Sequence, residues 1–169
     1  LNGHLKSLGA HSDLVHETAR RCPLPLNEKT SIETSYWSFG SQVSAEALAY
    51  ATRQFVVCDR TVIDLYPFAL CAYEREKESV SKDLNALKSL IKDYISARPY
   101  DFLFYVPIRT ELWNTYFVPD DKSYQQRIDH EFRKFLNEMQ HPFYEVTSLD
   151  HYQRLEEIMR CVQAKYTFL

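Results

Sequence analysis

The chain has 169 residues, of which 45% are hydrophobic and 25% are charged, and its net charge is −3 at pH 7. These values are ordinary for a soluble globular domain with a core of its own, and they exclude a strongly basic nucleic-acid-binding surface. No apolar run approaches the roughly 20 residues needed to cross a bilayer, so we expect no membrane span.

The four cysteines do not form a metal-binding pattern, because none of them makes a C-x-x-C pair and their spacing matches neither a zinc finger nor a zinc ribbon. They are Cys22, Cys58, Cys71 and Cys161. Free thiols without a disulfide framework favour a reducing compartment, and the polar start lacks a signal-peptide pattern. We therefore expect a cytoplasmic protein.

The N-terminal stretch at 1–8 has the apolar spacing of an amphipathic helix, which Gly9 ends. It shows no cap and no start signal. We therefore expect that the sequence begins inside an element and that a segment upstream is missing. A short strand is predicted next at 13–17, with Glu17 at its end.

A loop is predicted at 22–34, where prolines and an asparagine interrupt any regular pattern. Ser35 is then predicted to cap a helix over 36–53. Gln42 lies on this helix. Its amide could hydrogen-bond a substrate, or it could be an ordinary surface group.

The apolar run at 55–58 ends abruptly in Asp59 and Arg60. Such a run, bounded by polar residues, predicts a strand buried on both faces of a parallel sheet. In an open parallel sheet, ligands bind at the carboxyl ends of the strands, where an acid can reach a phosphate-bound Mg²⁺ directly or through water. The alternative is a strand followed by a solvated, charged turn.

The second half of the chain continues this alternation of strands and helices. Strands are predicted at 101–107 and 143–147, and helices at 64–77, 81–97, 124–139 and after the cap Ser148. The strand at 101–107 is nearly all apolar, which is typical of a central position. The alternation predicts an α/β fold of three layers, with helices on both faces of one mainly parallel sheet, in a single domain at 1–169.

The carboxyl ends of parallel strands share one edge, so Glu17, Asp59 and Arg60 are predicted to lie together although they are far apart in sequence. One carboxylate near Mg²⁺ and another near a hydroxyl group is an arrangement that phosphoryl transfer can use. One acid would serve the metal and the other would accept a proton.

Basic side chains from the segment after the third strand would neutralise charge on a transferring phosphoryl group. The candidates are Arg109, Lys122, Arg127 and Arg133. The alternative is a solvated helix face with salt bridges, which is favoured for Arg133.

Several motifs spread over nearly the whole chain carry a family resemblance. They are Glu-Thr-Ala-Arg at 17–20, Gln42, Val-Val-Cys-Asp-Arg-Thr-Val-Ile-Asp at 56–64, Gln-Arg-Ile-Asp-His-Glu-Phe-Arg at 126–133 and Pro-Phe-Tyr-Glu-Val-Thr at 142–147. With these motifs the sequence resembles the NadR-like AAA domain family. Members of that family are P-loop NTPases, related to ribosylnicotinamide kinase domains and more distantly to deoxynucleoside and thymidylate kinases.

The resemblance implies a P-loop NTPase, kinase-like fold that binds ATP or GTP with Mg²⁺ and a small nucleoside-like acceptor. It also implies a role for each matching residue. These are the metal-side acid Asp59, the candidate general base Glu17, the acceptor-side residues Arg20 and Gln42, and Arg60, which contacts the acceptor or holds the catalytic site together. A lid at about 108–127 carries Arg109, Lys122 and Arg127.

The sequence departs from the family pattern in two places. The D-G-x-R element of the lid is matched here by Asp-Asp-Lys-Ser at 120–123, and the Lys122 ammonium lacks the fork of a guanidinium. No G-x-x-x-x-G-K-[ST] loop occurs in the 169 residues. We therefore expect the first strand and the P-loop to be missing, and no turnover by these residues alone.

The expected function is an ATP- or GTP-binding P-loop NTPase domain, which acts as a nucleoside-type kinase when a P-loop is present. One alternative is a nucleotide-sensing module on the same fold. Another is a non-catalytic protein that uses the fold for interaction, through an aromatic surface around Trp113, Tyr116 and Phe117, and that assembles as a homo-oligomer. The expected ligands are a nucleotide and a small acceptor, with no nucleic acid.

Overall fold

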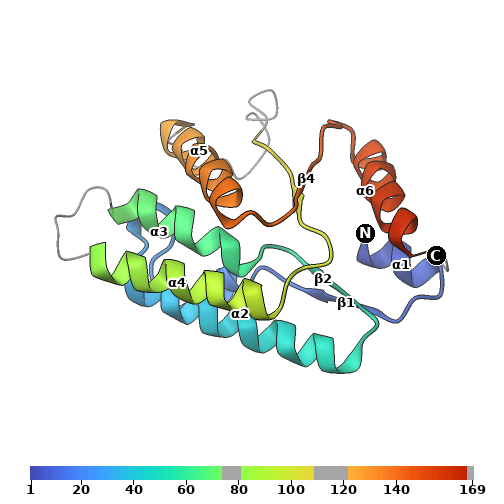
Figure 1. Ribbon diagram of the computed structural model, residues 1–169, viewed down its shortest axis with the longest axis horizontal. Helices are drawn as coiled ribbons and strands as arrows, with labels where there is room; N and C mark the ends of the chain where they lie inside the picture. Colours follow the sequence, from blue (N-terminus) through green and yellow to red (C-terminus); the bar gives the residue numbers. More distant parts are fainter. Residues whose placement is uncertain (74–80, 109–121, 167–169) are drawn as a thin grey trace.

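The described part of the chain, residues 1–73, 81–108 and 122–166, alternates helices with short strands in a computed structural model (Figure 1). Its strands are β1 (Ser12–Val15), β2 (Phe55–Cys58), β3 (Phe104–Tyr105) and β4 (Tyr144–Glu145). Its α-helices are α1 (Asn2–Ser7), α2 (Ile32–Thr52), α3 (Leu65–Tyr73), α4 (Ser81–Ala97), α5 (Lys122–Met139) and α6 (His151–Lys165), and its 3₁₀ helices are η1 (Thr18–Arg21), η2 (Asn27–Lys29) and η3 (Val62–Asp64). Within these ranges no helix is both long and apolar enough to cross a membrane.

The strands pair in parallel, as the α/β pattern of the sequence predicts. β1 pairs with β2 from Ser12 opposite Phe55 onward. β3 pairs with β4, with Phe104 opposite Tyr144. The mixed α/β class with parallel strands is therefore confirmed.

The described residues form two separate two-stranded sheets and not the single sheet that the sequence predicts. The prediction that β2 is buried on both faces is wrong, because each of its four residues is only half-buried. β2 has β1 on one edge and no described strand on the other. The predicted central position of 101–107 is not found among the described residues either, where β3 is short and pairs only with β4.

Helix α2 begins at Ile32, earlier in the chain than predicted, and Ser31 is its cap. The Ser31 hydroxyl accepts from the Thr34 backbone N–H, and the Thr34 hydroxyl accepts from the Ser31 backbone N–H, both at 3.3 Å. This reciprocal capping box satisfies two donors that the helix itself leaves without partners. The prediction of Ser35 as the cap is therefore wrong, and Ser35 lies buried inside the helix.

Helix α6 is capped by Asp150 and not by Ser148. The Asp150 carboxylate accepts from the backbone N–H groups of Tyr152 at 2.9 Å and Gln153 at 3.0 Å. Ser148 was free to take another partner, and its hydroxyl donates to Glu157 on α6 at 2.8 Å. Two carboxylates thus fix the loop to α6. Asp150 in the loop accepts from the first turn of the helix, and Glu157 in the helix accepts from Ser148 in the loop.

The main hydrophobic core lies where η3 packs with helices α3, α4 and α5. Val62, Ile63 and Leu87 are fully buried in it, and Phe135 is almost fully buried. Burying a side chain of this size stabilises the fold by roughly 1.5–3 kcal/mol. This core fixes the backbone that follows Arg60 and so supports the edge of the first sheet.

Candidate functional site

Glu17 and Asp59 lie at the same edge of the first sheet. Glu17 stands two residues after β1 ends, and Asp59 follows β2 directly. The backbone N–H of Asp59 donates to the Val15 carbonyl at 2.8 Å, which continues the strand pairing by one residue. The two acids are therefore positioned by the rigid pairing of β1 with β2.

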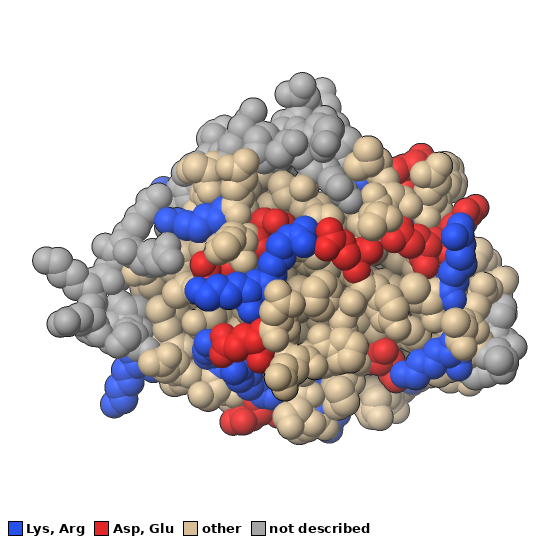
Figure 2. All heavy atoms as spheres, turned by 45° about the horizontal axis from the view of Figure 1, so that its top comes forward, with Lys and Arg blue, Asp and Glu red and all other residues tan. Residues whose placement is uncertain are grey.

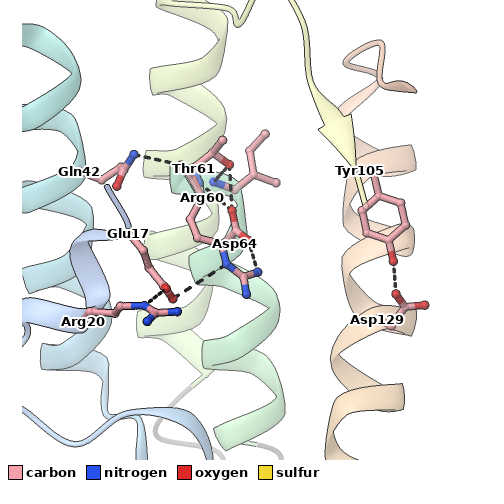
Figure 3. A network of polar contacts seen from close by, with 9 residues as sticks. Glu17, Arg20, Gln42, Arg60, Thr61, Asp64, Tyr105 and Asp129 are labelled. Atoms are coloured by element: carbon pink, nitrogen blue, oxygen red, sulfur yellow. Dashed lines mark hydrogen bonds and ion pairs between the residues drawn. The ribbon is translucent and has the colours of Figure 1, made fainter. Parts of the chain in front are cut away.

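The Glu17 carboxylate lies between two arginines (Figure 3). Arg20 donates its Nε–H to Glu17 Oε2 at 2.5 Å, and Arg60 Nε lies 3.9 Å from Glu17 Oε1. The Glu17 side chain is 21% exposed, whereas Arg20 is 79% exposed and Arg60 52% exposed. The second distance is too long for a hydrogen bond, so Oε1 can accept a proton from another donor.

Arg60 has a strained backbone, with φ at 76°, in the left-handed region that favours glycine. An L-residue with a Cβ atom pays roughly 1–2 kcal/mol for this conformation. Such strain persists only where the surroundings hold it, and it is concentrated at functional sites. It turns the chain sharply after Asp59 and aims the Arg60 side chain toward Glu17.

Two neighbours hold Arg60 in this conformation. Gln42 donates to the Arg60 carbonyl at 3.2 Å, and the Arg60 guanidinium donates to Asp64 Oδ1 at 3.1 Å. The other Asp64 oxygen accepts from the backbone N–H of Thr61 at 2.8 Å. The adjacent Asp64 charge raises the pKa of Arg60, so the guanidinium stays positive. Sequence reasoning did not single out Asp64, although its place three residues after Thr61 is a capping-box signal.

Gln42 lines the pocket beside Glu17, but both ends of its amide are used by the protein. Thr18 donates to Gln42 Oε1 at 2.9 Å, and Gln42 Nε2 donates to Glu46 at 2.8 Å as well as to Arg60. The residue is only 2% exposed. In this structure Gln42 therefore joins η1, α2 and the turn after β2, which is a positioning function.

Glu46 is a buried carboxylate that sequence reasoning missed. It is 7% exposed and accepts from the hydroxyl groups of Tyr94 at 2.8 Å and Tyr100 at 2.9 Å, in addition to Gln42. Burial, reinforced by the Glu46 charge, raises the pKa of the Cys58 thiol to about 12. Glu46 thus connects the Gln42 contacts to α4 and to β2.

The signal for this cluster was a polar stripe on α2. Its buried polar residues recur at intervals of three and four, which places them on one helical face: Ser35, Ser38, Gln42 and Glu46. Sequence reasoning took Ser35 as a helix cap and, of the other three, considered only Gln42, as a substrate contact or an ordinary surface group. The structure buries that face against the first sheet and its loops.

Two spaces meet at this sheet edge. One is a pocket of about 90 Å³, and the other is a cavity of about 1230 Å³ lined by β2 and β3. Arg60, Thr61 and Asp64 line both of them. Glu17 lines the pocket and Asp59 lines the cavity. The turn after β2 is therefore a wall between the pocket and the cavity, with Glu17 on the pocket side and Asp59 on the cavity side.

The Asp59 carboxylate is exposed and makes no hydrogen bond or ion pair with any residue that the structure describes. Among residues 1–73, 81–108 and 122–166, no group of three or more His, Cys, Asp and Glu side chains could hold a metal ion. Mg²⁺ does not need such a group, because it commonly uses one or two carboxylates together with phosphates and water. The Asp59 donor thus fits a phosphate-bound Mg²⁺.

The predicted lid lies largely outside the described residues, as do Arg109, the Lys122 side chain and the aromatic surface at 113–117. The described parts of the lid are Ile108 and the start of α5. There Arg127 donates to the Cys71 carbonyl of α3 at 3.0 Å, and its guanidinium lies 5.7 Å from the Tyr124 ring centre. Arg127 therefore holds α5 against α3.

The surface around the site carries charges of both signs. Figure 2 shows basic and acidic side chains next to one another across one face of the molecule, with no large area of a single sign. Local charges of this kind can orient a small ligand but give no broad attraction to a polyanion.

Comparison with models of known protein families and with curated proteins found no match for this chain.

Proposed function

We propose that the chain is the acceptor-side part of a kinase-like domain that transfers a phosphoryl group from ATP or GTP, with Mg²⁺, to a hydroxyl group of a small nucleoside-like molecule. The observation that carries this proposal is the wall after β2. It has Glu17 on the side of the small pocket and Asp59 on the side of the large cavity. Phosphoryl transfer needs two such sides, one for the attacking hydroxyl and one for the metal-bound phosphates.

The acceptor hydroxyl would enter the pocket beside Glu17. Glu17 Oε1 can accept its proton, since Glu17 Oε2 is already bonded to Arg20 and Oε1 is 3.9 Å from Arg60 Nε. A pocket of about 90 Å³ holds a few water molecules and is well below the roughly 300 Å³ of common ligand sites. It therefore takes the hydroxyl-bearing end of an acceptor, and the rest of the molecule lies outside it.

The two arginines supply positive charge beside the transferred group. Arg60 is held charged by Asp64, and Arg20 by its hydrogen bond with Glu17, which raises the pKa of Arg20. Arg20 is largely exposed and Arg60 half-exposed, so both can turn toward an anionic oxygen. Guanidinium groups stabilise the charge that spreads over the phosphoryl oxygens in the transition state.

These residues do not include the cradle of backbone N–H groups that binds the phosphates of a nucleotide in P-loop enzymes. The 169 residues alone are therefore expected to bind the acceptor and a divalent cation, with no phosphoryl transfer. A P-loop kinase-like, three-layer fold is part of this proposal.

The test is binding of small nucleosides to the chain, measured by saturation-transfer NMR with nicotinamide riboside and the deoxynucleosides. We expect contacts through the sugar, and a loss of affinity of about tenfold to a hundredfold in Arg60→Gln, because Arg60 on the acceptor side can also donate to a sugar hydroxyl group and a charge-assisted hydrogen bond contributes about 1.5–3 kcal/mol. Lys92→Gln, on α4 and paired with Glu138, removes the same charge away from the site and should bind normally.

Mn²⁺ serves as the probe for the metal side. We expect it to broaden the NMR signals of the turn after β2, and Asp59→Asn to abolish that broadening. Absence of nucleoside binding at millimolar concentration, or equal binding by Arg60→Gln and the native chain, would overturn the proposal. Broadening that persists in Asp59→Asn would remove Asp59 from the metal side.

A further inference from the structure

The hydroxyl group of Ser38 is buried beside the site and is not bonded to the protein. Ser38 lies on α2, is 2% exposed and lines the pocket beside Glu17. Its hydroxyl makes no hydrogen bond with any residue that the structure describes. A serine inside a helix can donate to the carbonyl one turn earlier, as Ser35 on the same helix does to Ser31 at 3.3 Å. The Ser38 hydroxyl forms no such bond, so it can both donate and accept in the pocket.

Ser38 is an exception among the buried hydroxyl groups. Every other buried serine or threonine in the described ranges donates its hydroxyl proton within the protein: Ser12 to Asn2, Thr18 to Gln42, Thr34 to the Pro25 carbonyl and Ser35 to the Ser31 carbonyl. A buried polar group without a hydrogen bond is costly, and native proteins contain few of them. Because the Ser38 hydroxyl opens onto a pocket, a bound molecule can supply the missing partner.

The place of Ser38 is one helical turn away from the reacting end of the pocket. Gln42 marks that end, because it donates to the Arg60 carbonyl at 3.2 Å (Figure 3). Gln42 also accepts from Thr18, the neighbour of Glu17 in the sequence, at 2.9 Å. Ser38 precedes Gln42 by four residues, which places it on the same face of α2, about 6 Å further along the helix axis. A molecule with a hydroxyl group at Glu17 therefore brings atoms close to that hydroxyl, and not its far end, to Ser38.

The remaining lining of the pocket favours an uncharged partner for Ser38. Leu26 and Phe68 contribute apolar surface. The charged side chains in the lining are two acids and one base, Glu17, Asp64 and Arg60, and Arg60 is already paired with Asp64. This balance disfavours an anionic group in the pocket. A hydroxyl group carries no charge and can both donate to Ser38 and accept from it.

We infer that Ser38 determines specificity by binding a second hydroxyl group of the acceptor, close in space to the hydroxyl group that reacts at Glu17. The acceptor class is then a polyhydroxyl compound, such as the sugar of a nucleoside, and not a simple alcohol or a phosphorylated sugar. In a nucleoside that reacts at its 5′-hydroxyl group, the second group is the 3′-hydroxyl. This inference rests on the proposed phosphoryl transfer and adds the residue that recognises the sugar.

The test compares two nucleosides that differ by one hydroxyl group, thymidine and 3′-deoxythymidine, in titrations followed by saturation-transfer NMR. We expect the native chain to bind thymidine about fivefold more tightly, because the analogue leaves the Ser38 hydroxyl without a partner. This comparison needs no variant. Ser38→Ala removes the hydroxyl and should bind the two nucleosides with affinities within about twofold of each other.

Ser44→Ala is the control, since Ser44 is an exposed serine on the same helix. It should keep the native preference for thymidine. Urea denaturation gives a second readout, which separates binding from a structural function. Because the Ser38 hydroxyl has no bond in the protein and alanine favours a helix, Ser38→Ala should be at least as stable as the native chain.

Three results would overturn the inference alone. They are equal affinities of the native chain for the two nucleosides, a preference for thymidine that persists in Ser38→Ala, and a Ser38→Ala variant that is clearly less stable than the native chain. In each case, nucleoside binding that is weakened in Arg60→Gln would leave the proposed phosphoryl transfer in place. Absence of binding by any nucleoside would overturn both the proposed function and the assignment of Ser38.

Discussion

The two sheets carry similar polar residues near their strand ends but use them differently. At the second sheet, Asp129 accepts from the Tyr105 hydroxyl and from Arg133 at 3.2 Å, and Arg133 also pairs with Glu145 at 2.9 Å. Figure 3 shows the Tyr105–Asp129 pair apart from the cluster around Glu17. At the first sheet, the Asp59 carboxylate makes no hydrogen bond or ion pair with a described residue, and the next residue is strained.

This difference separates a structural cluster from a candidate site. In the second sheet each charge is satisfied by another, and the Arg133 guanidinium also lies 4.7 Å from the Tyr105 ring centre. The pairing bears out the prediction of a salt-bridged helix face for Arg133. In the first sheet, Asp59 has no such ion pair at the end of β2, and the backbone of Arg60 next to it is strained. Strained residues cluster at active sites and ligand-binding sites, which favours the first sheet as the functional one.

The largest effect is expected for Glu46→Ala, which tests whether the site around Glu17 and Asp59 depends on the buried Glu46 carboxylate. The substitution leaves the donors of Gln42, Tyr94 and Tyr100 without their acceptor. Each buried donor left unsatisfied costs about 1–3 kcal/mol, so we expect a loss of about 3 kcal/mol or more in the free energy of unfolding. Urea denaturation followed by circular dichroism measures it.

Ser44→Ala is the matched control, since Ser44 is an exposed residue on the same helix. Its free energy of unfolding should stay within about 0.5 kcal/mol of the native value. If Glu46→Ala lowered the free energy of unfolding by less than about 1 kcal/mol, the Glu46 carboxylate would not be what supports the first sheet.

The pair Asp129→Ala and Asp59→Ala tests the comparison directly. Asp129→Ala removes the acceptor of the buried Tyr105 hydroxyl and a partner of Arg133, so we expect a loss of about 2 kcal/mol in the free energy of unfolding. Asp59→Ala removes no described hydrogen bond or ion pair of the side chain and should change this quantity by less than about 0.5 kcal/mol. Mn²⁺-dependent broadening should be lost in Asp59→Ala alone. Equal stability losses in the two variants would contradict the distinction.

Substitutions of Arg60 can separate backbone strain from side-chain function. Arg60→Gly and Arg60→Ala both lose the ion pairs with Asp64 and Glu17, but only glycine is at ease at a φ of 76°. We expect Arg60→Gly to be more stable than Arg60→Ala by about 1 kcal/mol in thermal unfolding, with nucleoside binding weakened in both. Equal stabilities would mean that the backbone of Arg60 is not strained in solution.

Much of the fold was predictable, because local patterns determine it. The apolar run of β2, the stripes of α4 and α5 and the parallel pairing of β1 with β2 all followed from periodicity and alternation. The helix caps were predicted less well. Ser31 and Ser35 are both good capping residues, and the choice between them depends on the Thr34 hydroxyl, whose contact with the Pro25 carbonyl at 3.1 Å is a tertiary feature.

The site was predictable only in part. Glu17, Asp59 and Arg60 could be placed together because the carboxyl ends of parallel strands share an edge. The function of Gln42 could not be predicted, since its partners Thr18 and Glu46 come from different elements. The burial of β2 was overestimated, because an apolar sequence shows that a strand suits two neighbours but not that both are present among these residues.

The smallest effect we predict is a pH dependence in the second half of the molecule, at Glu157. Hydrogen bonds from the backbone N–H and hydroxyl groups of Thr147 and Ser148 lower the pKa of Glu157 to about 2. Because the folded pKa lies below that of the unfolded chain, about 4.3, the contribution of Glu157 to stability is complete above that value. It declines as the pH falls through the range from about 4 to 2.

Chemical denaturation at a series of pH values should show Glu157→Gln less stable than the native chain at pH 7, with the difference shrinking toward pH 2. Thr147 and Ser148 follow β4, so this loss would report on the second sheet and its loop to α6. A difference independent of pH would show that the carboxylate charge is not what these donors stabilise.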